Sequence, residues 1–151
     1  MNIPLVEFDP DPEGMVGIAD PKIKFKDIDG CVVSFFGEVV KKVSQMEGAE
    51  KISEFLRDVG DFPLYKIPYR GKNIAFYYSG VGAPLAVCMI EQAISYGLSK
   101  FVACGGAGAL KKGLQAGKIV IPVSALRDEG TSYHYLKAER TIDLDPETVE
   151  V

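Results

Sequence analysis

The sequence predicts an α/β fold built on a sheet that is at least partly parallel. Short, nearly continuous apolar runs alternate with helical patterns, which is typical of strands buried on both faces. Glycine clusters follow several of these runs, as they do where strands turn into helices. The chain has 151 residues, of which 47% are hydrophobic and 25% charged. These values indicate a globular chain of single-domain size.

The N-terminal residues differ in character from the rest of the chain. Residues 1–30 are rich in Pro, Asp and Gly and show no sustained period, so we expect an extended arm over the domain surface. Residues 31–151 are expected to form the α/β domain. Its first strand is predicted at 31–36, an apolar run between Gly30 and Gly37.

The next segment predicts a helix followed by a hairpin. Apolar residues between 38 and 59 recur at helical spacing, with Gly48 as a break in the pattern. The aromatic and aliphatic runs 64–69 and 73–79 are separated by Arg70-Gly71. That arrangement indicates two antiparallel strands joined by a tight turn.

A second helix is predicted between Pro84 and Tyr96, because proline suits its first turn and Gly97 its C-terminal stop. Two rows at helical spacing form its apolar stripe: Leu85, Met89 and Ala93, and beside them Ala86, Ile90 and Ile94. Further buried strands are expected at 101–104 and 119–123.

The end of the chain carries a helix-start pattern. Asp145 suits the N-cap, Pro146 the first helical position and Glu147 the first turn. The residues that follow, 148–151, are too few for a helix with independent stability. We therefore expect this chain to be the N-terminal part of a longer protein, or a remnant of one. The alternative is a frayed terminal turn.

Composition argues against several classes of function. The net charge is −4 and basic residues are spread along the chain, so we expect neither a nucleic-acid nor a membrane partner. No stretch reaches the ~18 apolar residues that span a bilayer. Cys31, Cys88 and Cys104 lie in apolar runs and are expected to be buried and reduced, which points to the cytoplasm. No metal-ligand pattern is visible, and no metal is expected.

Glycine turns mark the candidate site. Clusters at 80–82 and 105–108 follow predicted strands, and Gly37 follows the first strand. Glycines at the carboxyl ends of strands let backbone N–H groups approach a ligand closely. The pattern predicts a cleft for a small anionic or polar ligand. The alternative is that these glycines only make tight turns between strands and helices.

Other chemical motifs are weaker. A dinucleotide-binding loop, and with it a nicotinamide-dependent oxidoreductase, is disfavoured because Leu85 stands where the third glycine would be. His134 is the only histidine, and no nucleophile motif lies near it, which favours a loop residue among tyrosines over a catalytic base. Arg127-Asp128-Glu129 is interpreted as a solvated charged turn placed near the predicted cleft.

Five motifs in unbroken order between residues 31 and 135 resemble those of the nucleoside phosphorylase and nucleosidase family, typified by uridine and purine nucleoside phosphorylases. They are Phe36-Gly37-Glu38-Val39-Val40-Lys41, Tyr78-Ser79-Gly80-Val81-Gly82-Ala83-Pro84, Cys104-Gly105-Gly106-Ala107-Gly108-Ala109-Leu110, Leu114-Gln115-Ala116-Gly117-Lys118-Ile119-Val120, and the stretch from Arg127 to His134. Each motif is short, and the resemblance rests on their order and spacing.

The resemblance implies a three-layer α/β/α fold with a central mixed sheet, truncated here at its C-terminus. It implies phosphorolysis of the N-glycosidic bond of a uridine or purine nucleoside, with phosphate as co-substrate, no cofactor, and a homo-oligomer. Carried over by position, the phosphate-binding residues are Gly37 and Lys41. The nucleoside-binding residues are Gly82, Gly105, Gly106, Ala107 and Gly108, with Arg127 and His134 adjacent to the site.

Several positions depart from the family pattern. Lys41 stands where phosphorylases of the family have arginine, Ala103 replaces a second arginine, and Gly106 replaces a threonine. Lysine keeps the charge but loses the bidentate fork. A nucleosidase that uses water, or a non-catalytic nucleoside-binding module, therefore stays open. The family's ribose-gripping segment belongs to its C-terminal half, so we expect the chain alone to be inactive.

Overall fold

The computed structural model describes residues 3–11, 23–57, 60–114 and 117–149. The chain divides into two compact units. We call residues 15–107 the sheet unit, and residues 1–14 together with 108–151 the terminal unit. The predicted division into an arm, 1–30, and a domain, 31–151, stays a prediction.

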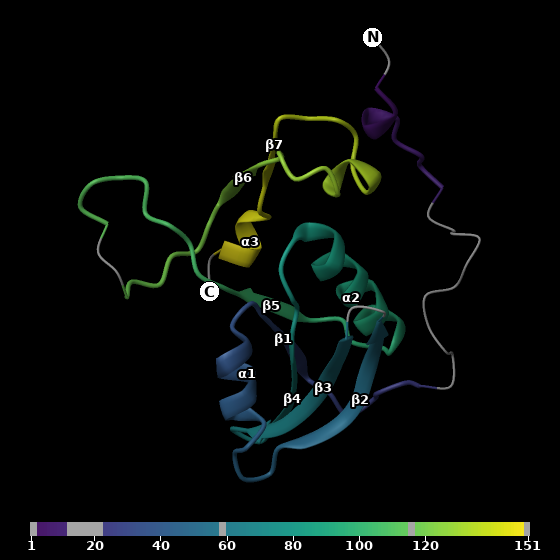
Figure 1. Ribbon diagram of the computed structural model, residues 1–151, viewed down its shortest axis with the longest axis vertical. Helices are drawn as coiled ribbons and strands as arrows, with labels where there is room; N and C mark the ends of the chain where they lie inside the picture. The colour runs from purple at the N-terminus through teal and green to yellow at the C-terminus, as the bar shows by residue number, and fades with distance from the viewer. Residues whose placement is uncertain (1–2, 12–22, 58–59, 115–116, 150–151) are drawn as a thin grey trace. The chain divides into compact units, whose positions relative to one another are not determined.

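The sheet unit is built on a mixed five-stranded sheet with the order β2-β3-β4-β1-β5 (Figure 1). Its strands are β1 (Gly30–Ser34), β2 (Glu50–Arg57), β3 (Gly60–Tyr69), β4 (Lys72–Tyr78) and β5 (Phe101–Cys104). Strand β1 lies between β4 and β5 and runs parallel to both. Strands β2 and β3 extend the sheet antiparallel beyond β4. The predicted α/β class and mixed sheet are confirmed.

Two helices cover the two faces of this sheet: α1 (Gly37–Val43) and α2 (Ala83–Ser95). Helix α2 packs the fully buried Met89 and Ala93 against the core. Successive side chains of a strand point to opposite faces of the sheet. Tyr77 of β4 belongs to the core cluster that includes Met89 and Ala93 of α2. The ring of the next residue, Tyr78, lies 3.8 Å from the Cβ position of Gly37 in α1, so α1 covers the opposite face. The three layers are therefore α1, the sheet and α2.

The core lies between α2 and the sheet. Its buried members are Cys31, Val33, Phe55, Leu64, Ala75, Tyr77, Met89, Ala93, Tyr96 and Leu98. The ring of Phe55 meets Tyr77 edge-on with centroids 4.9 Å apart, and it stacks on Tyr96 at 5.9 Å. Ile23, Phe25 and Ile28 pack against this cluster from the segment before β1.

Residues typical of turns and helix ends correctly predict the β3–β4 hairpin and both ends of α2. Arg70 and Gly71 both have positive φ, 50° and 77°, as a two-residue hairpin turn of type I′ requires, and they join β3 to β4. Helix α2 contains Pro84 in its first turn and ends before Gly97, whose φ is 94°. Of the predicted apolar stripe, Ile94 is exposed rather than buried.

The helix predicted over 38–59 is wrong in its second half. Helix α1 ends at Val43, Gly48 turns the chain with φ 81°, and β2 then pairs with β3. A register shift between Lys51 and Ser53 changes the alternation of side chains, so the apolar spacing resembled a helix. Tertiary pairing brings Phe55 opposite Phe62 and buries it, which overrides the local pattern. Val59, the last predicted position, lies outside the described residues.

In the terminal unit, the described residues form short elements: η1 (Pro4–Val6), β6 (Ser124–Leu126), η2 (Ser132–His134), β7 (Thr141–Asp143) and α3 (Pro146–Val149). Strands β6 and β7 pair antiparallel. The predicted strand 119–123 is wrong, because the strand begins only at Ser124 and Ile119 and Val120 are exposed. The predicted helix start is confirmed, since Asp145 Oδ1 accepts from the N–H of Glu147 at 3.0 Å.

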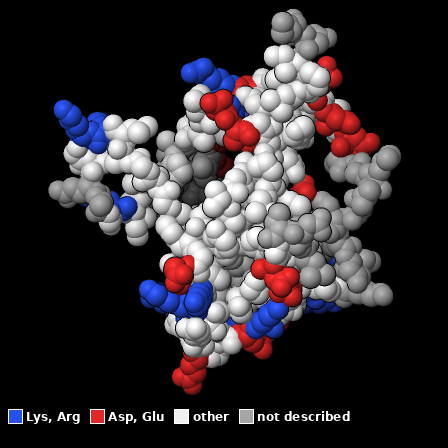
Figure 2. All heavy atoms as spheres, in the orientation of Figure 1, with Lys and Arg blue, Asp and Glu red and all other residues white. Residues whose placement is uncertain are grey.

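The cysteine prediction is correct for one residue of three. Cys31 is buried, Cys88 is half-buried and Cys104 is exposed, and all three are free thiols. Cys104 is exposed because β5 is the outer strand of its sheet, with β1 on one side only. None of the described helices is long and apolar enough to cross a membrane. On the face seen in Figure 2, acidic and basic side chains are interspersed in small groups.

Candidate functional site

Three parallel strands of the sheet unit end side by side. In the register of the sheet, Ser34 of β1 is paired with Tyr78 of β4 and with Cys104 of β5. The turns that follow these strands therefore start at one edge of the sheet. In open α/β sheets the carboxyl edge is where ligands bind.

Backbone hydrogen bonds continue past the strand ends and tie the turns together. The N–H of Ser79 donates to Ser34 O at 2.8 Å, and the N–H of Phe35 donates to Cys104 O at 2.9 Å. The N–H of Phe36 donates to Ser34 Oγ at 3.1 Å. These bonds fix the backbone directions of all three turns relative to one another.

Close packing explains one of the predicted glycines. A Cβ on Gly105 would lie 3.2 Å from the ring of Phe35, whereas one on Gly106 would lie 3.4 Å from the ring of Phe36, an ordinary van der Waals contact. The two phenylalanines are themselves partly exposed, at 38% and 43%. The side chains of Phe35 and Phe36 thus border the turn after β5. Neither phenylalanine was among the predicted site residues, although their position immediately before Gly37 was a usable signal.

The remaining predicted residues of the sheet unit lie around the same edge. Gly37 is the first residue of α1, and Lys41 is exposed one helical turn later. Gly82 precedes α2 with φ 99°, a conformation that favours glycine. Ala107, the last residue of this unit, is exposed. The structure thus brings together the turns that carry Gly37, Gly82, Gly105 and Gly106.

A buried serine lies at the same edge and was also missed. Ser79 directly follows β4, its side chain is fully buried, and its Oγ has no hydrogen-bond partner among the described residues. The signal for it was its place immediately before the glycine cluster 80–82. Buried hydroxyls usually have a hydrogen-bond partner, so the Ser79 hydroxyl is an unusual buried polar group at this edge of the sheet.

The terminal unit holds the other predicted residues. Gly108 has no described atom within 4 Å of its Cβ position, and His134 is exposed at the end of η2. The interpretation of Arg127-Asp128-Glu129 as a solvated turn is wrong for Arg127, which is only 5% exposed. The segment folds back on Arg127 and covers it, so a charge run that looked solvated contains a buried cation.

Arg127 is hydrogen-bonded within its own segment. Its Nε donates to Ser132 Oγ at 2.9 Å, Nη1 to Lys137 O at 2.6 Å and Nη2 to Leu136 O at 3.1 Å. The guanidinium also lies over the ring of Tyr133, 4.6 Å from its centroid. Carbonyl oxygens and an aromatic face stabilise a buried guanidinium.

Glu129 accepts several hydrogen bonds within the same segment. Its carboxylate accepts from the hydroxyl and the N–H of Ser132 and from the N–H of Thr131. The Ser132 hydroxyl, followed by these amides and the charge of Arg127, holds the pKa of Glu129 below its usual range.

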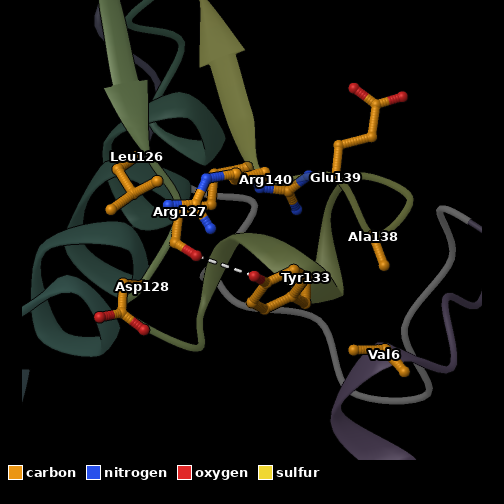
Figure 3. Close-up of a pocket in the computed structure, with 8 residues that line it drawn as sticks. All are labelled: Val6, Leu126, Arg127, Asp128, Tyr133, Ala138, Glu139 and Arg140. Carbon is orange, nitrogen blue, oxygen red and sulfur yellow. Dashed lines mark hydrogen bonds between the residues drawn. The ribbon is translucent and has the colours of Figure 1, made fainter.

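A cavity of about 540 Å³ opens beside this segment (Figure 3). Its lining includes Tyr133, whose hydroxyl donates to Arg127 O, and the exposed side chains of Asp128, Glu139 and Arg140. Within the described ranges no group of three or more His, Cys, Asp or Glu side chains could hold a metal ion.

Comparison with known proteins decides the family. The family model described as the phosphorylase superfamily matches residues 30–151, which is most of the chain. The chain belongs to the phosphorylase superfamily. This match confirms the relationship expected from the five motifs.

Relatives within the superfamily carry nucleoside phosphorylase names. The chain is 29% identical over 87 residues to a guanosine phosphorylase of Halorubrum lacusprofundi, covering 58% of this chain and 36% of the relative. It is also 29% identical over 102 residues to a uridine phosphorylase of Thermococcus kodakarensis, covering 68% of this chain and 36% of the relative.

Solved structures give the same picture for the fold. A uridine phosphorylase of Vibrio fischeri matches with a TM-score of 0.63 at 25% identity, over 72% of this chain and 43% of that one. A second structure of that enzyme matches with a TM-score of 0.66 at 22% identity, over 83% and 52%. The chain thus spans about a third of these curated relatives and about half of the solved structures.

Proposed function

We propose that the protein cleaves the N-glycosidic bond of a uridine or purine nucleoside by phosphorolysis, as part of a full-length enzyme. The observation that carries this proposal is the alignment of three glycine turns at the carboxyl edge of β4, β1 and β5. The names of the relatives, guanosine and uridine phosphorylase, supply the substrate class.

In phosphorolysis a phosphate oxygen bonds to C1′ of the ribose while the bond from C1′ to the base nitrogen breaks. The base leaves with the electron pair, and the ribose carries positive charge in the transition state. Lys41 is proposed to hold the phosphate as a point charge, together with the backbone at Gly37. Gly82, Gly105, Gly106, Ala107 and Gly108 are proposed to lie along the nucleoside, with Arg127 and His134 adjacent.

The assay that tests the proposal uses protein expressed from its complete reading frame. Uridine, guanosine and related nucleosides are incubated with and without inorganic phosphate, and free base is measured. Base release that requires phosphate is the expected result. Release without phosphate would mean hydrolysis, and nucleoside-dependent thermal stabilisation without release would mean a non-catalytic binding module.

We further expect the protein to form a homo-oligomer and to work in the cytoplasm. Exposed large apolar side chains in the terminal unit support self-association: Leu110, Leu114, Ile119, Val120, Ile121 and Val123.

A further inference from the structure

Phe36 is an apolar residue at a place where helix formation favours a polar one. It is the N-cap of α1, and its side chain makes no capping hydrogen bond. Ser, Thr, Asp and Asn are preferred at an N-cap, because their side chains accept from the free N–H groups of the first turn. The stability of α1 therefore gives no reason for a phenylalanine at residue 36, and the ring needs another explanation.

The backbone of Phe36 is held at both of its polar groups. Its N–H donates to the Oγ of the buried Ser34 at 3.1 Å, and its carbonyl oxygen accepts from the N–H groups of Val39 and Val40, each at 3.1 Å. The ring is nevertheless 43% exposed. A fixed backbone thus presents an apolar surface to water, which costs free energy unless a ligand covers the ring.

The ring of Phe36 reaches from the turn after β1 to the turn after β5. Its Cε1 and Cζ atoms lie 3.4 and 3.5 Å from the Cβ position of Gly106. Phe36 itself directly precedes Gly37, the first residue of α1. Both glycines are exposed, and all three residues belong to the sheet unit. The ring therefore lies between two of the glycine turns at the carboxyl edge of the sheet.

We propose that the ring of Phe36 packs against the ribose of the nucleoside and keeps water away from C1′. This inference rests on the proposed function, in which Gly37 binds phosphate and Gly106 lies along the nucleoside. The reacting phosphate oxygen bonds to C1′, so the ribose lies where the two ligands meet. The ring lies between the two turns that hold these ligands, and the carbon surface of the ribose covers it.

The position of the ring determines which nucleophile reaches C1′. A phosphate oxygen that bonds to C1′ gives ribose 1-phosphate, and the base leaves with the electron pair of the broken bond. A water oxygen that bonds to C1′ instead gives free ribose, and a proton of the water goes to the base. An apolar ring beside C1′ leaves no hydrogen-bond partner for such a water on that side. The ratio of the two sugar products therefore reports on the ring.

Phe36→Ser tests this proposal in two separate ways, in protein from the complete reading frame. Serine removes the ring and is able to cap α1, so Tm should be unchanged or higher. KM for the nucleoside should rise by about tenfold, the order expected when part of an aromatic side chain loses its contact. The share of free ribose among the sugar products should also rise. Phe36→Leu, which keeps an apolar side chain, should show a smaller rise in both quantities.

Tyr69→Ser is the matched control. Tyr69 is an aromatic residue of the same sheet and is 57% exposed. It is paired with Lys72, the first residue of β4, whereas the glycine turn follows the last residue of that strand. Tyr69 thus lies at the opposite edge of the sheet from the proposed site. Tyr69→Ser should leave both KM for the nucleoside and the ratio of the sugar products at their wild-type values.

The possible results separate this inference from the proposed function. A Tm of Phe36→Ser below that of the wild type would overturn the inference, because the ring would then pack against the protein. Equal KM values and equal sugar products for Phe36→Ser and Tyr69→Ser would also overturn it, while the proposed function would stand. Absence of phosphate-dependent base release by the wild type would instead refute the proposed function, and this inference with it.

Discussion

The hydroxyl of Tyr77 is buried in the core with no hydrogen-bond partner among the described residues. Burial raises the pKa of this phenol well above its usual range, which agrees with a neutral and poorly solvated group. The same core holds a contrasting tyrosine, Tyr96, whose hydroxyl accepts from Gln92 Nε2 at 2.5 Å. Substituting each tyrosine by phenylalanine therefore compares the loss of an unpaired hydroxyl with the loss of a hydrogen-bonded one.

We predict that Tyr77→Phe leaves the free energy of unfolding unchanged or raises it by up to about 1 kcal/mol, because an unpaired buried hydroxyl is removed. Tyr96→Phe should lower it by about 1 kcal/mol, because Gln92 loses this acceptor. Urea unfolding measures both. A loss for Tyr77→Phe equal to that for Tyr96→Phe would show that Tyr77 has a partner in solution.

Cys31 makes stability depend on pH in the alkaline range. Burial raises the pKa of its thiol from 9.0 to about 12. The unfolded chain therefore loses this proton at lower pH than the folded protein does. The contribution of the buried Cys31 thiol to the free energy of unfolding is therefore complete below pH 9 and is lost as the pH rises towards 12.

Stability should accordingly fall between pH 9 and about pH 12 more steeply in the wild type than in Cys31→Ala. Cys104→Ala, which alters an exposed thiol, should keep the wild-type slope. Denaturant midpoints at several pH values provide the measurement. Equal slopes for the wild type and Cys31→Ala would mean that Cys31 is solvated in the folded protein.

Among the elements, the turn between β4 and α2 is tightly constrained by packing. Gly80 has φ 72°, and a Cβ added there would lie 2.4 Å from Leu85 Cδ2, which is a steric clash. Gly71, in the hairpin turn, has a similar φ of 77°, but a Cβ added there would meet no described atom within 4 Å. Alanine at Gly71 would therefore cause backbone strain alone, whereas alanine at Gly80 would cause the same strain and a clash with Leu85.

Gly71→Ala should cost about 1 kcal/mol, the strain of a left-handed alanine. Gly80→Ala should cost at least about 1 kcal/mol more, because Leu85 must move out of its packed position. Urea midpoints of the two variants test this difference. Equal losses would indicate that Leu85 moves aside freely.

Local patterns predicted most elements of the sheet unit. The hairpin, α2 and the glycine turns depend on residues close together in sequence, such as Arg70-Gly71 and Pro84. Strand β2 was misjudged because its identity depends on a bulge and on pairing with β3, which apolar spacing alone does not show. The burial of Arg127 depends on carbonyls nine and ten residues further along, so residue type suggested exposure.

For the whole molecule, the described surface leaves many large apolar side chains exposed, including Leu110 and Ile119 of the terminal unit. Such side chains favour association in water. We predict that the purified chain self-associates, with a mass above that of one copy in light scattering. Replacing Ile119 and Ile121 by Lys should lower that mass. A stable monomer at all concentrations would refute this prediction.

For the molecule as a whole, the glycine turn after β1, with Lys41, is proposed to bind phosphate for nucleoside cleavage. Lys41 and Lys42 are adjacent, both exposed, and both in the last turn of α1, so Lys42→Ala is a matched control. The decisive measurement is the KM for phosphate during uridine or guanosine cleavage by protein from the complete reading frame. Lys41→Ala should raise it by about tenfold or more, the loss of one charge-assisted contact, while Lys42→Ala leaves it unchanged. Equal values for the two variants, or cleavage that does not depend on phosphate, would contradict this claim.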